Sequence, residues 1–125
     1  MSEPDHALFD AGNVVLQSGI THRGTQLAYK TWGTLNAERS NTVLFMTPFG
    51  AHHRDIAFMI GAGRALDPER YFFVVPNLFG NGLSSSPSNA VSPFDGSRWP
   101  HFTAADNVRI QRTMLRDVFG VERLT

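Results

Sequence analysis

The stretch Tyr71-Phe-Phe-Val-Val-Pro76 is followed directly by Asn77-Leu-Phe-Gly-Asn-Gly-Leu-Ser-Ser-Ser-Pro-Ser88. The first part is a run of β-forming apolar residues without polar alternation, which is typical of a parallel strand buried on both faces. The second part begins a loop of glycines and small hydroxyl residues. Because ligand sites in open α/β sheets gather outside the carboxyl ends of the strands, this boundary predicts the fold class and the edge where chemistry would take place.

The residues before this strand predict a sheet margin and one more buried strand. Residues 9–16 and 25–32 predict two strands, and the connection at residues 18–24 has Gly19 near its start and Gly24 at its end, as an antiparallel hairpin would. Residues 42–46 predict a short buried strand, and residues 55–60 predict a short helix. The order indicates an antiparallel edge followed by parallel strands with helices.

The residues after the strand predict a long loop and a well-capped helix. Residues 77–100 are rich in Gly, Ser, Pro and Asn, and loops of such length are usually functional or mobile. Thr103-Ala-Ala-Asp106 is close to a capping box, and the helix is expected to run to about Phe119 with Gly120 as its stop. The face we expect to be buried is Ala105, Val108, Met114, Leu115 and Val118. Residues 121–125 indicate the run-in to another strand.

Composition excludes several classes of protein. The 125 residues suffice for one domain, and 11 basic and 11 acidic side chains give a formal net charge of zero. A nucleic-acid partner or a polybasic membrane anchor would need an excess of positive charge. Without cysteine there is no disulfide or thiolate site, and without a long apolar run there is no membrane-spanning segment. These features predict a cytoplasmic protein with neither a nucleic-acid nor a membrane partner.

Three short motifs favour structural over catalytic interpretations. Gly80-x-Gly82 lacks the third glycine of a dinucleotide fingerprint, and no helix follows it. Residues 84–86 are serines outside any G-x-S-x-G elbow, so we interpret them as partners of backbone groups in the loop. His52 and His53 are adjacent and therefore point in different directions, so we predict no metal site.

Thr47-Pro48-Phe49-Gly50 lies between a predicted strand and a predicted helix. Such a turn can present backbone N–H groups to an anionic oxygen, as an oxyanion hole requires. Many strand-to-helix turns have no such role, so this motif by itself does not distinguish an oxyanion hole from an ordinary turn.

Six segments of the chain occur in an order and at spacings that match those of a known protein family. They are Leu27-Ala-Tyr-Lys-Thr-Trp-Gly-Thr-Leu-Asn36, Phe45-Met-Thr-Pro-Phe-Gly-Ala-His-His-Arg-Asp55, Ile60-Gly-x-Gly-Arg-Ala-Leu-Asp67, Pro76-Asn-Leu-Phe-Gly-Asn-Gly-Leu-Ser-Ser-Ser-Pro-Ser-Asn89, Phe94-Asp-Gly96, and Thr103-x-x-Asp-Asn-Val108 with Phe119-Gly-Val-Glu122. From about residue 9 onward, this set resembles the N-terminal third of the homoserine O-acetyltransferase family. Ala51-His52-His53 departs from the family's pattern at the end of the first loop, which leaves the identity of the oxyanion donor open.

The resemblance implies an α/β-hydrolase fold, with residues 1–125 as the N-terminal portion of a single domain and an incomplete sheet. It implies a serine-dependent O-acyltransferase of methionine biosynthesis, which passes an acyl group from acyl-CoA to an alcohol such as homoserine through an acyl-serine intermediate. The backbone N–H of Phe49 is then the candidate oxyanion donor, since Pro48 has no N–H. The candidate residues of the substrate-binding loops are Thr47, Pro48, Gly50, Asn77, Gly80, Asn81 and Gly82.

The resemblance also places the nucleophilic serine, the aspartate and the histidine after Thr125. We therefore expect residues 1–125 alone to be inactive, with no bound cofactor. Acyl-CoA and a small alcohol are the expected substrates of the parent protein, and a homodimer of the parent is left open. Three alternatives remain: part of an α/β-hydrolase-fold serine esterase, a non-catalytic module that completes the sheet of another chain, and a small nucleotide-binding module.

Overall fold

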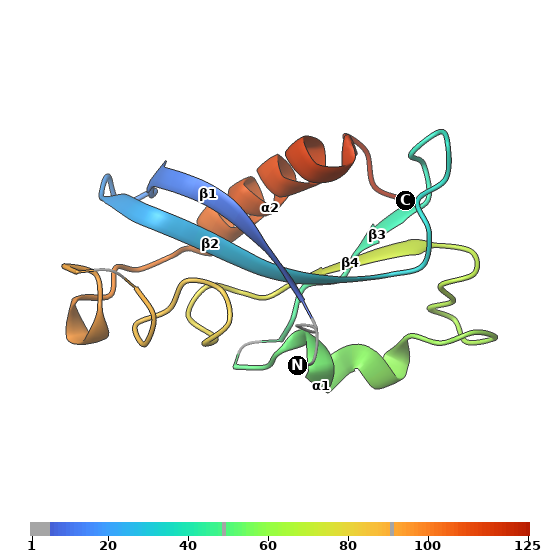
Figure 1. Cartoon of the computed structure of the whole chain (residues 1–125), viewed down its shortest axis with the longest axis horizontal. Helices are drawn as coiled ribbons and strands as arrows, with labels where there is room; N and C mark the ends of the chain where they lie inside the picture. The colour runs from blue at the N-terminus through green and yellow to red at the C-terminus, as the bar shows by residue number, and fades with distance from the viewer. Residues whose placement is uncertain (1–5, 49, 91) are drawn as a thin grey trace, which may run out of the picture.

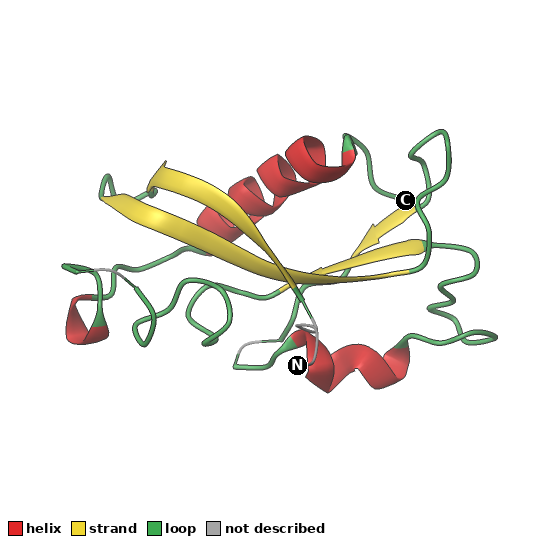
Figure 2. Ribbon diagram, in the orientation of Figure 1, coloured by secondary structure: helices red, strands yellow, loops and turns green. Residues whose placement is uncertain are grey.

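The computed structural model describes residues 6–48, 50–90 and 92–125. In chain order its elements are β1 (Ala7–Val15), β2 (Thr21–Trp32), β3 (Thr42–Leu44), α1 (His53–Ile56), the 3₁₀ turn η1 (Ala57–Met59), β4 (Phe72–Pro76), the 3₁₀ turn η2 (Gly96–Arg98) and α2 (Ala104–Phe119). Figures 1 and 2 show a twisted sheet with α1 on one face and α2 on the other. Within the described ranges, no helix has the length and apolar character needed to cross a bilayer.

The four strands form one mixed sheet in the order β1-β2-β4-β3. β1 and β2 pair antiparallel, with Ala7 opposite Tyr29 and Val15 opposite Thr21, so the predicted hairpin at the margin is confirmed. Its connection is shorter than predicted, because residues 21–24 belong to β2, which pairs with β1 from Thr21 onward. β2 also pairs antiparallel with β4, whereas β3 pairs parallel with β4. The carboxyl ends of β3 and β4 therefore lie at the same edge of the sheet.

β4 is the central strand of the core, and its residues alternate between two apolar clusters. Phe72 and Val74 pack in the cluster that contains Ile110, Met114 and Leu115 of α2. Phe73 and Val75 pack on the opposite face with Ile56 of α1 and with Ile60. All five residues of β4 are buried, which is the reason for its continuous apolar run.

β3 is more exposed than its sequence predicts. Thr42 is buried, but Val43 and Leu44 are only half-buried, because β3 is the outermost strand on its side of the described sheet. No strand is assigned to residues 121–125, but the Thr125 N–H donates to the Thr42 carbonyl at 2.8 Å. The backbone therefore reaches the outer edge of β3, in keeping with the predicted run-in to another strand.

α1 differs from its predicted boundaries. It begins at His53, two residues earlier than expected, and its last turn continues as η1 rather than as α-helix. The Asp55 carboxylate explains the early start, because it accepts the His52 N–H at 2.8 Å and so caps the first turn.

α2 has the predicted ends. The Thr103 N–H donates to the Asp106 carboxylate and the Asp106 N–H donates to the Thr103 hydroxyl, both at 3.0 Å, which completes the capping box. Gly120 ends the helix with φ +67°, a left-handed conformation that favours glycine.

The predicted buried face of α2 is wrong for three of its five residues. Ala105, Val108 and Val118 are exposed, whereas Met114 and Leu115 are buried as expected. The remaining buried residues are Asp106, Asn107, Ile110 and Gln111. Apolar periodicity alone missed this face because its first turns bury polar side chains that hydrogen-bond to neighbouring loops.

Candidate functional site

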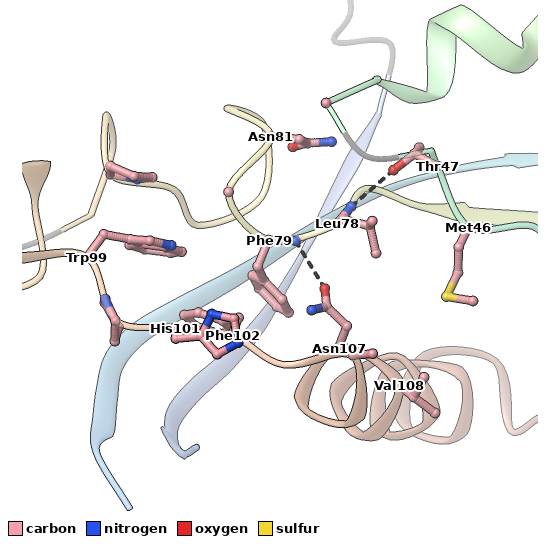
Figure 3. Close-up of a pocket in the computed structure, with 15 residues that line it drawn as sticks. Met46, Thr47, Leu78, Phe79, Asn81, Trp99, His101, Phe102, Asn107 and Val108 are labelled. Atoms are coloured by element: carbon pink, nitrogen blue, oxygen red, sulfur yellow. Dashed lines mark hydrogen bonds between the residues drawn. The ribbon is translucent and has the colours of Figure 1, made fainter. Parts of the chain in front are cut away.

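Two loops meet at the shared carboxyl edge of β3 and β4. The Thr47 N–H, beyond β3, donates to the Pro76 carbonyl at 3.4 Å. The Thr47 hydroxyl accepts the Leu78 N–H at 3.2 Å, and the threonine is only 3% exposed (Figure 3). The parallel pairing of the strands thus continues as a side-chain link between the two loops.

Asn77 is fully buried and connects three parts of the chain. Its N–H donates to the Ala28 carbonyl of β2 at 2.8 Å, and its side-chain Nδ2 donates to the same oxygen at 3.1 Å. Its Oδ1 accepts the His53 N–H at the start of α1 and the Asn81 Nδ2, at 3.0 and 3.1 Å. Because all of these partners are inside the protein, Asn77 holds the loops rather than a ligand.

Asn81 and His52 close the loops on each other. Asn81 Nδ2 donates to the Ala51 carbonyl at 3.0 Å, and the Asn81 carbonyl accepts from His52 Nε2 at 2.6 Å. His52 therefore carries a proton on Nε2 and has a structural partner there. Within the described ranges, no group of three or more His, Cys, Asp or Glu side chains is arranged to hold a metal ion.

The three serines of residues 84–86 are buried, and their hydroxyls accept backbone N–H groups. Ser84 Oγ accepts the Ala28 N–H at 2.9 Å and Ser85 Oγ accepts the Gln26 N–H at 2.8 Å. Both hydroxyls thus pair with backbone N–H groups of β2 at residues that have no partner in β4. Ser86 Oγ accepts the Gly82 N–H at 2.7 Å within the loop. The interpretation of these serines as partners of backbone groups is confirmed.

A cavity of about 720 Å³ lies between the two loops and the N-terminal turns of α2. This volume is within the usual range of small-molecule sites. Figure 3 shows side chains from both loops, from the segment before α2 and from α2 itself around it. The described lining residues are Met46, Thr47, Gly50, Leu78, Phe79, Gly80, Asn81, Pro87, Trp99, Pro100, His101, Phe102, Ala104, Asn107 and Val108.

Asp106 fixes the N-terminus of α2 beside this cavity. It is 2% exposed, and its carboxylate accepts the Gln17 N–H at 2.8 Å in addition to the Thr103 N–H. Burial by itself would raise the pKa of this carboxyl. The hydrogen bonds from Thr103 and Gln17, with the positive charge of Arg109, outweigh burial and hold the pKa below its ordinary value of 3.8. An ionised carboxylate therefore ties the β1–β2 turn to α2.

Curated relatives and solved structures are similar to most of this chain, although no protein-family model matches it. The ethyl acetate hydrolase of Pseudomonas veronii is 36% identical over 98% of this chain, and the homoserine O-acetyltransferase of Thermobifida fusca is 38% identical over 85% of it. An acetylester hydrolase structure from Corynebacterium glutamicum has a TM-score of 0.92 at 36% identity and covers 95% of this chain. The chain is a homologue of the homoserine O-acetyltransferase family.

This homologue has the α/β-hydrolase fold of its relatives. The homoserine O-acetyltransferase structure from Bacillus anthracis matches 95% of the chain with a TM-score of 0.81 at 27% identity. The chain covers 36% of the Pseudomonas hydrolase, 32% of the Thermobifida transferase, and 35% and 38% of the two solved chains. It thus spans about a third of the length of the curated relatives it matches.

The predicted site residues of this α/β-hydrolase homologue take three different positions. Thr47, Gly50, Gly80 and Asn81 line the cavity. Pro48 is exposed beside them, whereas Asn77 and Gly82 are absent from the described lining. Asn77 joins the two loops from a buried position, and the exposed Gly82 donates its N–H to Ser86 within one loop. Phe49, the candidate oxyanion donor, lies outside the described residues.

Sequence reasoning missed the aromatic side of the cavity. Phe79 belongs to a segment that carries the family resemblance, but Trp99 was predicted only as part of the long loop, and His101 and Phe102 were given no role. Their signal was their position: Trp99-Pro-His-Phe102 immediately precedes the Thr103 cap, and the N-terminus of α2 points to the same edge as the carboxyl ends of the strands. Asn107, whose Oδ1 accepts the Phe79 N–H at 3.1 Å, was missed because it was not on the predicted apolar face.

Proposed function

We propose that residues 1–125 form the oxyanion-loop side of the active site of an α/β-hydrolase-fold serine hydrolase that acts on small carboxylic esters. The observation that carries this choice is structural similarity. Two structures, an acetylester hydrolase and the acetyl esterase MekB, match with TM-scores of 0.92 at 36% and 37% identity. The homoserine O-acetyltransferase of Bacillus anthracis matches at 0.81 and 27%. Of the alternatives that the sequence left open, this similarity favours water as the acyl acceptor.

The chemistry of the cavity supports the same choice. Among its described lining residues, His101 is the only one with a titratable side chain, and most others are apolar or aromatic. Homoserine carries a carboxylate and an ammonium group, and burying either group without a partner costs a binding free energy on the order of several kcal/mol. A neutral ester needs no such partner.

The chain's part in the reaction would be to hold the negatively charged oxygen of the tetrahedral intermediate. The Thr47 and Ala51 amides donate to the Pro76 and Pro48 carbonyls, and Pro48 has no N–H. Among the described residues of the loop, the Gly50 amide is therefore a candidate donor, and the family resemblance implies the Phe49 amide as the other. The attacking serine, its histidine base and the aspartate would come from residues outside 1–125, since these residues contain no G-x-S-x-G elbow and the three loop serines support backbone groups.

A second candidate is the homoserine O-acetyltransferase activity itself. It is favoured by the 38% identity with the Thermobifida fusca enzyme. In that case acyl-CoA and homoserine would be the substrates, and the complete protein would act in methionine biosynthesis. For either activity, a cytoplasmic location and a homodimer of the complete protein remain part of the proposal.

The experiment compares the two activities in the complete gene product, meaning the polypeptide encoded by the whole reading frame that contains these residues. Hydrolysis of ethyl acetate is followed by acid release, and transfer from acetyl-CoA is followed by free thiol with and without homoserine. We expect ester hydrolysis and no homoserine-dependent release of CoA. Homoserine-dependent release without ester hydrolysis would establish the second candidate instead.

Residues 1–125 expressed alone are the matched control. The proposal predicts no turnover of either substrate by this polypeptide. Turnover by it alone would contradict the assignment of the nucleophile to other residues. If it co-purified with a second polypeptide and the pair were active, the sheet-completing module would be the correct alternative.

A further inference from the structure

Three aromatic rings form a continuous stack along one side of the cavity. Phe79 and Phe102 have ring centroids 4.6 Å apart with an interplanar angle of 27°, and Trp99 and Phe102 have centroids 5.0 Å apart at 15°. All three line the cavity, and they come from two segments, the loop after β4 and the residues before α2. We name Phe79, Trp99 and Phe102 the ring stack; Figure 3 shows them on the side opposite Met46.

The ring stack is supported from behind by a buried histidine. His22 of β2 is 1% exposed, and its ring centroid lies 5.4 Å from that of Trp99 and 5.2 Å from that of Phe102. Its Nδ1 is 2.7 Å from the Thr25 hydroxyl, which itself donates to the His22 carbonyl, so Nδ1 carries the proton. Burial lowers the pKa of His22, so the support is a neutral ring that packs as an aromatic surface.

The front of the ring stack is fixed by α2. The Phe79 N–H donates to Asn107 Oδ1, and Asn107 Nδ2 donates to the Thr103 carbonyl at 2.9 Å, within the cap of the helix. The rings are therefore held from β2 and from α2 at once. A preorganised aromatic wall of this kind gains binding energy from apolar contact without first being ordered.

We infer that the ring stack is the subsite for the uncharged hydrocarbon part of the ester, and that Trp99 limits its length. This inference rests on the proposed function. Phe102 is the middle ring of the stack, because both Phe79 and Trp99 contact it, and Trp99 therefore forms one end. Replacing it with a small side chain would lengthen the apolar space available to the substrate. Apolar pockets distinguish substrates that differ by about one methylene group by roughly 10- to 200-fold in kcat/KM.

The test is a change in substrate selectivity, measured on the complete gene product. One series varies the acyl group, p-nitrophenyl acetate against p-nitrophenyl hexanoate; the other varies the alcohol, ethyl acetate against hexyl acetate. For Trp99→Ala we expect the ratio of kcat/KM for the long ester to that for the short ester to rise about tenfold in at least one series. The series that responds identifies the part of the ester that the stack contacts.

Three further variants separate binding from folding. Trp99→Phe keeps a ring in the stack, and we expect a ratio much closer to that of the wild type than the ratio of Trp99→Ala. Phe102→Leu keeps apolar packing on His22 but loses the ring stack, so it should shift selectivity in the same direction even if Trp99→Ala folds poorly. Phe58→Ala is the matched control, because Phe58 is 71% exposed on η1 and does not line the cavity.

Binding of acetanilide, a neutral analogue of phenyl acetate with an amide in place of the ester, is measured by calorimetry as a readout independent of turnover. If the wild type hydrolyses no ester but Trp99→Ala loses acetanilide affinity at least about fivefold, the proposed function fails, and the ring stack is an apolar binding site for another neutral ligand. If the wild type hydrolyses esters while Trp99→Ala and Phe102→Leu leave both selectivity ratios and acetanilide affinity unchanged, the subsite is wrong. Absence of both hydrolysis and acetanilide binding in the wild type would overturn both.

Discussion

The two halves of α2 bury different kinds of side chain, although they belong to one helix. The half beside the cavity buries Asp106 and Asn107, which hydrogen-bond to the β1–β2 turn and to the loop after β4. The other half buries Met114 and Leu115 in the apolar cluster on β4. The second half therefore holds the helix on the sheet, whereas the first half sets the positions of the loops that form the site.

Met114→Ala should produce the largest loss of stability in either half. Met114 is fully buried, so truncation leaves a cavity in the core and should lower the free energy of unfolding by about 3 kcal/mol. The KM for a small ester should stay within about twofold of the wild-type value, because Met114 does not line the cavity. Denaturant unfolding and steady-state kinetics measure the two quantities. A large change in KM with little loss of stability would show that the second half of α2 also positions the site.

Asp106→Asn tests the polar half through pH. The pKa of Asp106 is lowered in the folded protein, so its stabilisation is fully present above the ordinary value of 3.8 and is lost as the pH falls through the folded pKa. At pH 7 the substitution should cost about 2 kcal/mol of unfolding free energy, since hydrogen bonds to a charged group are lost or weakened.

The difference in stability between the wild type and Asp106→Asn should therefore shrink below about pH 4. Thermal unfolding at pH 7, 5, 4 and 3 measures it. A difference that stayed constant across this range would show that the charge of Asp106 does not stabilise the fold.

Asn107→Ala should separate most clearly the role of α2 in stability from its role in positioning the site. It removes the acceptor for the Phe79 N–H, so we expect a modest loss of stability of about 1 kcal/mol. The KM for esters should rise several-fold, because Phe79 is part of the ring stack. The reverse pattern, a large loss of stability with an unchanged KM, would assign Asn107 to the scaffold instead.

Arg109→Gln should have the smallest effect of the four. Arg109 Nη2 lies 3.3 Å from Asp106 Oδ1, but the arginine side chain is 54% exposed. Exposed ion pairs contribute little, so the loss of unfolding free energy should stay below about 1 kcal/mol. A loss as large as that of Asp106→Asn would mean that the charge pair, rather than the backbone hydrogen bonds, fixes the helix terminus.

Local signals in the sequence predicted the framework because they act over short distances. The unbroken apolar run of β4, the Thr103–Asp106 capping box and the Gly120 stop each depend on neighbours within a few residues. The two loops of the site were also predicted, because both follow strands at the same edge.

The missed features depend on partners that are distant in sequence. Asn107 is buried because it binds Phe79, 28 residues away, and Asp106 because it binds Gln17, 89 residues away. Hydrophobic periodicity contains no information about such bonds and therefore selected Val108 and Val118 instead. The ring stack likewise joins Phe79 to Trp99 and Phe102 only through the fold.

We propose that the loop after β3 holds the oxyanion of an acyl intermediate beside the ring stack. The most direct measurement is a crystal structure of the complete gene product after reaction with diethyl p-nitrophenyl phosphate, which phosphorylates an activated serine and mimics that intermediate. We expect a phosphoryl oxygen at about 2.7–3.1 Å from a backbone amide of Phe49 or Gly50, with an ethyl group in the cavity. A serine left unmodified, or a phosphoryl group bound away from this loop, would contradict it.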